Sequence, residues 1–257
     1  MQRINNPRFL LFFVLLIIIL AAIAFAVKEP EAEAPDVAEE MAPHPVFPLG
    51  PLEVTDTVVN TWAMMLMVGV GAFVAGRRLK LRPGMVQNAL EWLVESLENL
   101  ICQTVGYKDS SLFLPLVGTL AIFVGCANLL GLLPYLKSPT PDINTPLALA
   151  LIVLVSVPYF GIRMRGLKAY LKHYVEPIFL VLPIELASEI ARTFSLTFRL
   201  FGNMMAEEIF IAILFLMAPI VVPVPIQLFS ILTGLLQAYL FALLTCVYIG
   251  GAIHAHT

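Results

Sequence analysis

Charged residues are scarce in this 257-residue sequence, and their scarcity excludes most classes of soluble protein. Asp, Glu, Lys and Arg together make up 13% of the chain, whereas hydrophobic residues make up 60% and the mean hydropathy is +0.90. Such a chain cannot cover an apolar core with a polar surface, so it is predicted to be an integral membrane protein. The formal net charge of −3 says little as a sum, because the charges are unevenly placed along the chain, and nucleic acid is not an expected partner.

Cysteines and catalytic motifs are also few. The three cysteines, Cys102, Cys126 and Cys246, lie far apart, so we expect small core residues and neither a disulfide framework nor a metal site. The sequence contains no GxxxxGK(S/T) phosphate loop and no HExxH zinc motif. These absences argue against nucleotide chemistry and against a zinc protease within this chain.

The N-terminal apolar run, Phe9 to Val27, leaves two interpretations open. It follows Arg3 and Arg8 and is long enough to cross roughly 30 Å of hydrocarbon as a helix. Its end, AAIAFA, also has small residues spaced as in a signal-peptidase site. Residues 1–27 are therefore either a signal peptide or an extra transmembrane helix.

The rest of the chain divides near residue 57. Residues 28–57, rich in Pro, Ala and Glu, have little apolar surface to pack and are predicted to form a largely irregular external segment. Residues 58–257 are predicted to be the membrane domain, with spans at about 58–76, 113–133 and 147–162. The first and third of these spans lead into RRLKLRP and RMRGLKAYLK, and the positive-inside rule places both basic segments in the cytoplasm.

Residues 88–101, NALEWLVESLENLI, have a different pattern. Apolar residues recur there at helical spacing while three glutamates fall elsewhere, which predicts an amphipathic helix lying at the membrane interface.

The last hundred residues predict a long helical hairpin. From about 178 to 217 the sequence has no strong helix breaker after Pro183, so a fully helical segment would be about 60 Å long, twice the hydrocarbon thickness. This helix must be strongly tilted, curved or broken. A second long helix, about 226–253, returns to the cytoplasmic side, where His254 is expected to be a solvated terminal residue.

Polar residues form a stripe on the first helix of this hairpin. At about 100° per residue, Glu185, Arg192 and Arg199 stay within about 40° of one another, with Asn203 a further 40° round. Glu189, three residues before Arg192, is placed to neutralise it. Arg199 has no acid at three or four residues' distance, so its partner must be Glu207, another helix or another chain.

Charges inside a membrane are costly and normally face protein or water, so two roles are considered for the stripe. It fastens helices together, or it forms an ion path in which carboxylates load and unload an ion beside a fixed cation. Arginine suits the fixed cation because it stays charged where lysine would more readily lose its proton. A secondary transporter would also use such charges, but the internal repeats it predicts are absent from the sequence.

The stretch SLTFRLFGNMMAEE, residues 195–208, closely resembles the signature of subunit a of the rotary F-type ATP synthase. Three further stretches are similar to the same family in order and spacing: NLLGLLP at 128–134, PDINTPLALAL at 141–151 and LLQAYLFALLTCVYIGGA at 235–252. The likeness covers nearly the whole chain from about residue 45. It implies an all-α polytopic membrane protein with an interfacial amphipathic helix and a strongly tilted C-terminal hairpin.

The resemblance also implies roles for single residues. Arg199 matches the essential arginine that faces the rotor ring of c subunits, and Asn203 and Gln237 match its polar neighbours. Glu208, and beside it Glu207, match the outer half-channel, and Glu185 and Ser188 match positions near the cytoplasmic one. The family often has a small residue at position 207 and a histidine near position 230. This chain has Glu207 at the first position and no histidine near Ser230, so the separate roles of Glu207 and Glu208 stay open.

The implied function is that of an ion-translocating stator subunit, with two half-channels that couple H⁺ or Na⁺ flow to ATP synthesis or hydrolysis. The subunit would not be an enzyme by itself and would need no catalytic residue, cofactor or metal. The implied partners are the c-ring, b-type peripheral stalk subunits, the rest of the F1F0 complex and membrane lipid. The implied location is a bacterial-type inner membrane, crossed several times, with a cytoplasmic C-terminus.

Overall fold

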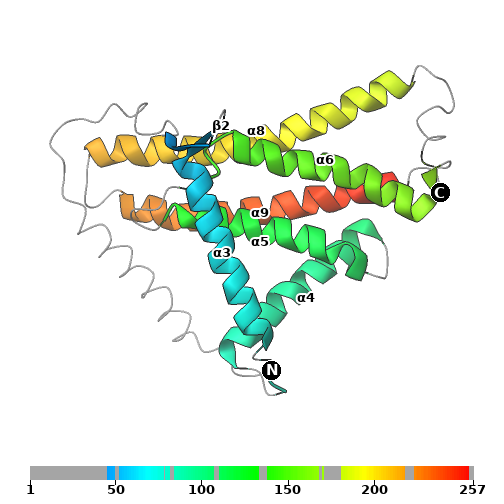
Figure 1. Ribbon diagram of the computed structural model, residues 1–257, viewed down its shortest axis with the longest axis horizontal. Coiled ribbons are helices and arrows are strands. Elements are labelled where there is room, and N and C mark those ends of the chain that lie inside the picture. The colour runs from blue at the N-terminus through cyan, green and yellow to red at the C-terminus, as the bar shows by residue number, and fades with distance from the viewer. Residues whose placement is uncertain are drawn as a thin grey trace.

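The computed structural model describes residues 45–49, 52–77, 79–81, 84–106, 110–132, 138–167, 170, 181–217 and 223–254. Within these ranges the chain is almost entirely helical (Figure 1). The elements are β1 (Pro45–Leu49), β2 (Leu52–Thr55), α3 (Asp56–Arg77), α4 (Met85–Val105), η1 (Ser110–Leu112), α5 (Leu114–Leu130), α6 (Asn144–Arg165), α8 (Val181–Met217) and α9 (Pro223–His254). The predicted N-terminal segment, residues 1–27, lies outside the described residues.

The short hairpin of β1 and β2 corrects part of the expectation for residues 28–57, which were predicted to be largely irregular. The two strands pair antiparallel, and the second leads directly into α3. The average composition of residues 28–57 did not predict this hairpin. The residues that favour strands in PVFPL and LEVT are few, and they lie among prolines and acidic residues. The start of α3 is tied to the chain before α6, since the Thr57 hydroxyl donates to Asp142 Oδ2 at 2.9 Å.

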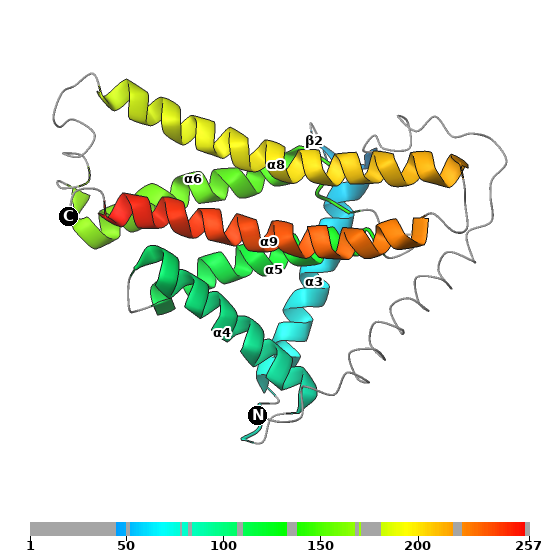
Figure 2. The same cartoon turned by 180° about the vertical axis from the view of Figure 1, so that it is seen from behind.

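The long helices surround a single main core. Helix α5 packs along α9, while α6 packs on both α8 and α9, as both views show (Figures 1 and 2). Small residues let α5 and α9 approach closely: a Cβ at Gly234 would lie 3.1 Å from Asn128 Cβ, and one at Gly125 would lie 3.5 Å from Ala238 Cβ. Asn128 Nδ2 also donates to Gly234 O at 3.1 Å, which adds a polar link across this contact.

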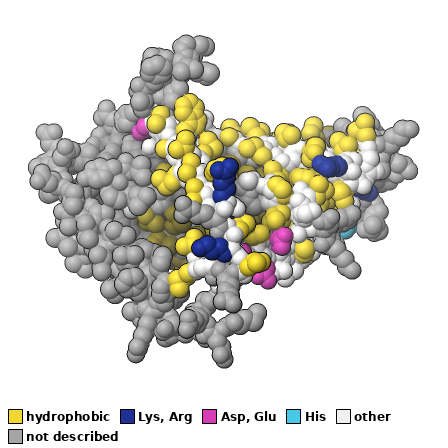
Figure 3. Space-filling view, turned by 60° about the horizontal axis from the view of Figure 1, so that its bottom comes forward, with side chains coloured by type: hydrophobic (Ala, Val, Ile, Leu, Met, Phe, Trp, Pro, Cys, Tyr) yellow, Lys and Arg dark blue, Asp and Glu magenta, His cyan; other side chains and the backbone are white. Residues whose placement is uncertain are grey.

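The described surface fits a lipid environment. Three helices, α3, α6 and most of α9, are long and apolar enough to cross a membrane, and α5 is a shorter apolar helix. Only 6% of the apolar window of α3 is buried inside the protein, so its apolar side chains face outward. Hydrophobic side chains spread over much of the described surface, with charged side chains at a few separate places (Figure 3). The predicted all-α polytopic membrane fold is therefore confirmed.

The helix predicted at 88–101 is also present and extends in both directions, over the whole of α4. Its C-terminal half is buried, with Leu97, Leu100, Ile101 and Val105 in the main core. Its N-terminal half meets the end of α3 at the tip of a V (Figure 1), and Leu90, Leu93 and Val94 are exposed there. Exposed apolar residues on an amphipathic helix are typical of a helix that lies at the membrane interface. The position of α4 at that interface stays a prediction.

The predicted hairpin consists of α8, with 37 residues, and α9, with 32. Helix α8 is one continuous helix that changes direction along its length (Figures 1 and 2). At about 1.5 Å per residue it is roughly 55 Å long, which is more than an upright span requires. Its tilt in the membrane stays a prediction.

The end of α9 is anchored at two points. Arg165 Nη1, near the basic end of α6, donates to Ala252 O at 3.4 Å, and His254 Nε2 lies 2.7 Å from Val105 O at the end of α4. Because a carbonyl oxygen only accepts, the His254 ring donates this hydrogen bond. His254 is exposed, as its terminal position suggested, and it also satisfies one of the carbonyl groups left open at the end of a helix.

We expect His254→Ala to lower the stability of this end of the protein by about 1 kcal/mol, because Val105 O loses its side-chain donor. Thermal denaturation of the purified subunit in detergent measures the effect. His254→Gln, whose amide also donates, should recover part of the loss, and equal stabilities for the alanine variant and the wild type would contradict the anchoring role.

Candidate functional site

Most of the predicted site residues come from α8 and Gln237 comes from α9, so the hairpin positions the site. The sequence of α8 keeps it helical because apolar helix formers separate the polar residues and no proline follows Pro183 within it. Arg199 is about 10 Å along the axis from Arg192 and about 12 Å from Glu207. It therefore lies between two polar groups, one toward each end of the hairpin.

The first polar link crosses the middle of the hairpin. Asn203 Nδ2 on α8 donates to Gln237 Oε1 on α9 at 2.9 Å. Gln237 is 3% exposed, so its amide is held inside the protein, whereas the Asn203 side chain is exposed. The structure thus brings together the two residues that were expected to neighbour Arg199.

The second polar link lies one helical turn further along α8. The Thr233 hydroxyl on α9 donates to Glu207 Oε2 at 3.1 Å. Both residues line a cavity of about 520 Å³ between α8 and α9, and the lining residues are Asn203, Ala206, Glu207, Phe210, Ile226, Phe229, Ser230 and Thr233. A water molecule needs roughly 10–15 Å³ of such space, so this cavity, whose lining is mostly apolar but carries four polar side chains, is large enough for many.

Glu207 and Glu208 are adjacent but are placed differently. Both are partly buried, yet within the described part of the chain only Glu207 contributes to the wall of this cavity. Successive residues of a helix diverge by about 100°, so two neighbours cannot face the same space equally. The sequence left the choice between them open, and the geometry favours Glu207 as the carboxylate of this cavity.

A third polar group lies toward the other end of the hairpin. Arg192 Nη2 lies 3.7 Å from Glu185 Oε1, so the ion pair joins residues two helical turns apart. The Arg192 guanidinium also lies over the Tyr248 ring of α9, 5.6 Å from its centroid. Ser188, on the same part of α8, is partly buried. The two side chains of the ion pair are 38% and 31% exposed, so the pair contributes little stability.

Arg199 differs from the charged and amide residues that form these contacts. Its side chain is partly buried, and across the described ranges it makes no ion pair and no hydrogen bond with another residue. Glu207, one of its expected partners, accepts a hydrogen bond from Thr233 instead. A guanidinium without a partner among the described residues is expected to face water or another chain, because its charge is costly in hydrocarbon.

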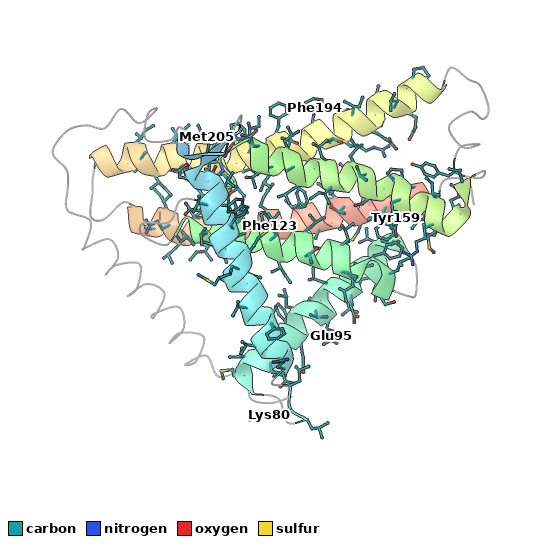
Figure 4. All side chains as sticks on the ribbon, viewed as in Figure 1. Lys80, Glu95, Phe123, Tyr159, Phe194 and Met205 are labelled. Atoms are coloured by element: carbon teal, nitrogen blue, oxygen red, sulfur yellow. The ribbon has the colours of Figure 1, made fainter. Side chains whose placement is uncertain are left out.

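The surface of α8 next to Arg199 is apolar and turned outward. Phe194 and Phe198 are 52% and 57% exposed, and their rings stack with centroids 6.1 Å apart. Figure 4 places Phe194 on the side of α8 that points away from α9. Ile190, one turn before Phe194, is also exposed. Arg199, which has no ion pair within the described ranges, therefore lies beside an exposed apolar helix surface.

Sequence reasoning missed Thr233 and Tyr248 and treated Ser230 only as a departure from a family pattern. A signal for two of them was present, because Ser230, Thr233 and Gln237 recur at helical spacing in an otherwise apolar helix. No comparable signal marks Tyr248. Among the described residues no group of three or more His, Cys, Asp or Glu side chains is arranged to hold a metal ion.

Comparison with known proteins gives one consistent family. The family profile described as ATP synthase A chain matches residues 58–250. The chain is 45% identical over 210 residues to "ATP synthase subunit a 2" of Pelobacter propionicus, a match that covers 82% of this chain and 92% of that protein. It is 46% identical over 208 residues to "ATP synthase subunit a 2" of a Bradyrhizobium species, covering 81% and 93% of the two chains. It is 40% identical over 214 residues to "ATP synthase subunit a" of Moorella thermoacetica, covering 83% and 98%.

Proposed function

Because this chain belongs to the ATP synthase A chain family, we propose that it is the ion-translocating stator subunit of an F-type ATP synthase in a bacterial membrane. In this role it forms two aqueous half-channels against the rotating c-ring and couples ion flow to ATP synthesis or hydrolysis. Nucleotide chemistry belongs to other subunits of the F1F0 complex, so the chain is not an enzyme by itself.

The observation that carries the proposal is the arrangement of polar groups on either side of Arg199. On one side Asn203, Gln237 and Glu207 lie at or beside the 520 Å³ cavity. On the other side Glu185 pairs with Arg192, and Ser188 lies on the same part of the helix. An arrangement that only fastened helices together would be expected to pair Arg199 as well.

The two polar groups are assigned to opposite sides of the membrane. Glu185 lies toward the end of the hairpin that holds Arg165 and His254, which the positive-inside rule places near the cytoplasm. Glu207 lies toward the opposite end, which α3 approaches with Asp56. We therefore assign the cavity with Glu207 to the outer half-channel and Glu185 with Ser188 to the cytoplasmic one, with the C-terminus in the cytoplasm.

Arg199 acts as the fixed cation between the two half-channels. An ion that enters from the outer cavity neutralises a ring carboxylate, travels round with the ring and leaves through the cytoplasmic half-channel. The guanidinium attracts each returning, ionised ring carboxylate and repels a cation that would pass directly between the half-channels. Arginine keeps this charge where hydration is poor.

The exposed apolar surfaces of the helices are assigned to the proposed partners. The apolar surface of α8 formed by Ile190, Phe194 and Phe198 lies next to Arg199 and is assigned to the c-ring. The exposed apolar faces of α3 and α4 are left for lipid and for b-type subunits of the peripheral stalk.

ATP-driven ion uptake by vesicles that contain the assembled complex tests the proposal, with Arg199→Ala compared with the wild type. The ion is identified in the same vesicles. We expect uptake that a protonophore abolishes and that does not require Na⁺. Na⁺-dependent uptake that resists the protonophore would keep the stator role and change the ion.

A further inference from the structure

Thr233 is the one residue of α9 whose side chain donates to a carboxylate of α8 within the described part of the chain. We propose that Thr233 is a positioning residue, which holds the Glu207 side chain at the cavity wall in both its ionised and its protonated form. The inference rests on the proposed function, because it requires Glu207 to take up and release the transported proton.

The surroundings of the Thr233 hydroxyl carry the argument. Its oxygen lies 3.1 Å from Glu207 Oε2, 3.2 Å from Phe229 O and 3.1 Å from Ser230 O. A threonine hydroxyl has one hydrogen to donate and two lone pairs that accept. It can therefore donate to only one of these three oxygens at a time, and two of them are carbonyls of its own helix that are always in reach.

This set of acceptors suits a carboxyl group that changes its protonation state. When Glu207 is ionised, the Thr233 hydroxyl donates to Oε2, a charge-assisted hydrogen bond. When Glu207 takes a proton from cavity water, its new O–H group can donate to Thr233 Oγ1. The threonine hydrogen then rotates to Phe229 O or Ser230 O. No hydrogen bond of the pair is lost, so the side chain keeps its place in both states.

Glu207 lies where a carboxyl group that keeps its place in both protonation states would serve proton transfer. Among the described residues that line the cavity, Glu207 is the only titratable one, and Asn203, Ser230 and Thr233 supply the remaining polar side chains. A glutamate held by a single flexible stem would lose this position whenever its charge changed. A carboxyl group kept at one place transfers protons faster, because the donor and the acceptor stay within reach of each other.

Thr233→Val is the direct test, since valine keeps the shape of threonine and removes the hydroxyl. We expect ATP-driven proton uptake by the assembled complex to fall about fivefold, the effect of losing one hydrogen bond of ordinary net strength in the reacting state. Thr233→Ser, which keeps the hydroxyl, should restore uptake to within about twofold of the wild type. The amount of subunit in the membrane is measured for each variant.

Thr245→Val is the matched control on the same helix. The Thr245 hydroxyl also donates to a carbonyl four residues back, Phe241 O, at 2.8 Å, and Thr245 is buried away from the cavity. We expect this variant to pump at the wild-type rate. If Thr233→Val also pumps at that rate, or if Thr233→Ser is as slow as Thr233→Val, the hydroxyl does not act as proposed.

The effect of Thr233→Val in a Glu207→Asp variant shows whether the Thr233 hydroxyl acts through Glu207. In Glu207→Asp the shorter carboxylate withdraws from Thr233, so adding Thr233→Val should lower uptake by less than about twofold. The same fivefold loss as in the wild type would overturn the positioning role. Uptake that depends on Na⁺ and resists a protonophore would overturn the proton exchange at Glu207.

Arg199→Ala, assayed in the same vesicles, separates this inference from the proposed function. If Arg199→Ala still pumps, the stator role itself fails. If Arg199→Ala abolishes pumping while Thr233→Val pumps normally, the stator role stands and only the role of Thr233 fails.

Discussion

Arg199→Ala should abolish ATP-driven ion pumping by the assembled complex. The guanidinium lies between the two polar groups of the hairpin, and within the described ranges it has no ion pair on its own chain that would mark it as a structural residue. In the proposed mechanism, a ring carboxylate passing this point without a fixed positive charge is not drawn into its ionised form, and an ion can move between the half-channels without turning the ring. Uptake is measured in vesicles during ATP hydrolysis, together with passive ion leak.

Two variants show whether the charge or the position of Arg199 matters. Arg192→Ala removes the other arginine of the same helix face, whose 3.7 Å ion pair with Glu185 is partly exposed, so pumping should stay within about fivefold of the wild type. Arg199→Lys should still be strongly impaired, because an ammonium loses its proton more readily where hydration is poor. Coupled pumping by Arg199→Ala at the wild-type rate would rule out the proposed mechanism.

Phe241→Ala should cause the largest loss of stability. Phe241 is 2% exposed in the main core, on the helix that packs against α5, α6 and α4. In a membrane the transfer of an apolar side chain to lipid costs little, so the loss comes mainly from the cavity and the missing van der Waals contacts. We expect a decrease of about 2–4 kcal/mol in the free energy of unfolding, at the lower end of values for such truncations in soluble cores.

The protein carries its own reporter for this measurement. Cys246 is fully buried on α9, while Cys102 and Cys126 are partly exposed and are replaced by alanine in the test protein. A thiol-reactive dye then labels Cys246 only when the core opens, and the temperature at which labelling begins reports stability. Phe194→Ala is the control, because Phe194 is 52% exposed and leaves no internal cavity. Equal labelling temperatures for both variants would show that Phe241 does not support the core.

The helical content of the fold could be predicted because it depends on local patterns. Apolar runs of sufficient length predicted α3, α5, α6 and α9, and the absence of proline after Pro183 predicted the continuous α8. The strands β1 and β2 were missed, since their pairing depends on a few residues within a proline-rich and acidic segment. The anchoring of His254 was also missed, because Val105 is 149 positions away in the sequence.

The candidate site was predictable in part. Helical spacing placed Arg199, Asn203 and the acidic residues on α8, and the family resemblance added Gln237. Spacing did not predict that Asn203 contacts Gln237 or that Glu207 contacts Thr233, because each contact joins two helices. It suggested Glu189 as the partner of Arg192 and did not predict the 3.7 Å ion pair that Arg192 makes with Glu185, seven residues away. Long side chains on a helix can reach across two turns, which a rule based on three or four residues leaves out.

The sequence by itself determined that this protein lies in a membrane, that its last hundred residues form a long hairpin and that charges interrupt that hairpin at fixed places. These properties depend on composition and on the helical repeat, which act within a single segment. Only the tertiary structure decided which of two adjacent glutamates lines the cavity and which hydroxyl meets it. That choice depends on how α9 is rotated and shifted against α8, and this packing is set by side chains that are far apart in the sequence.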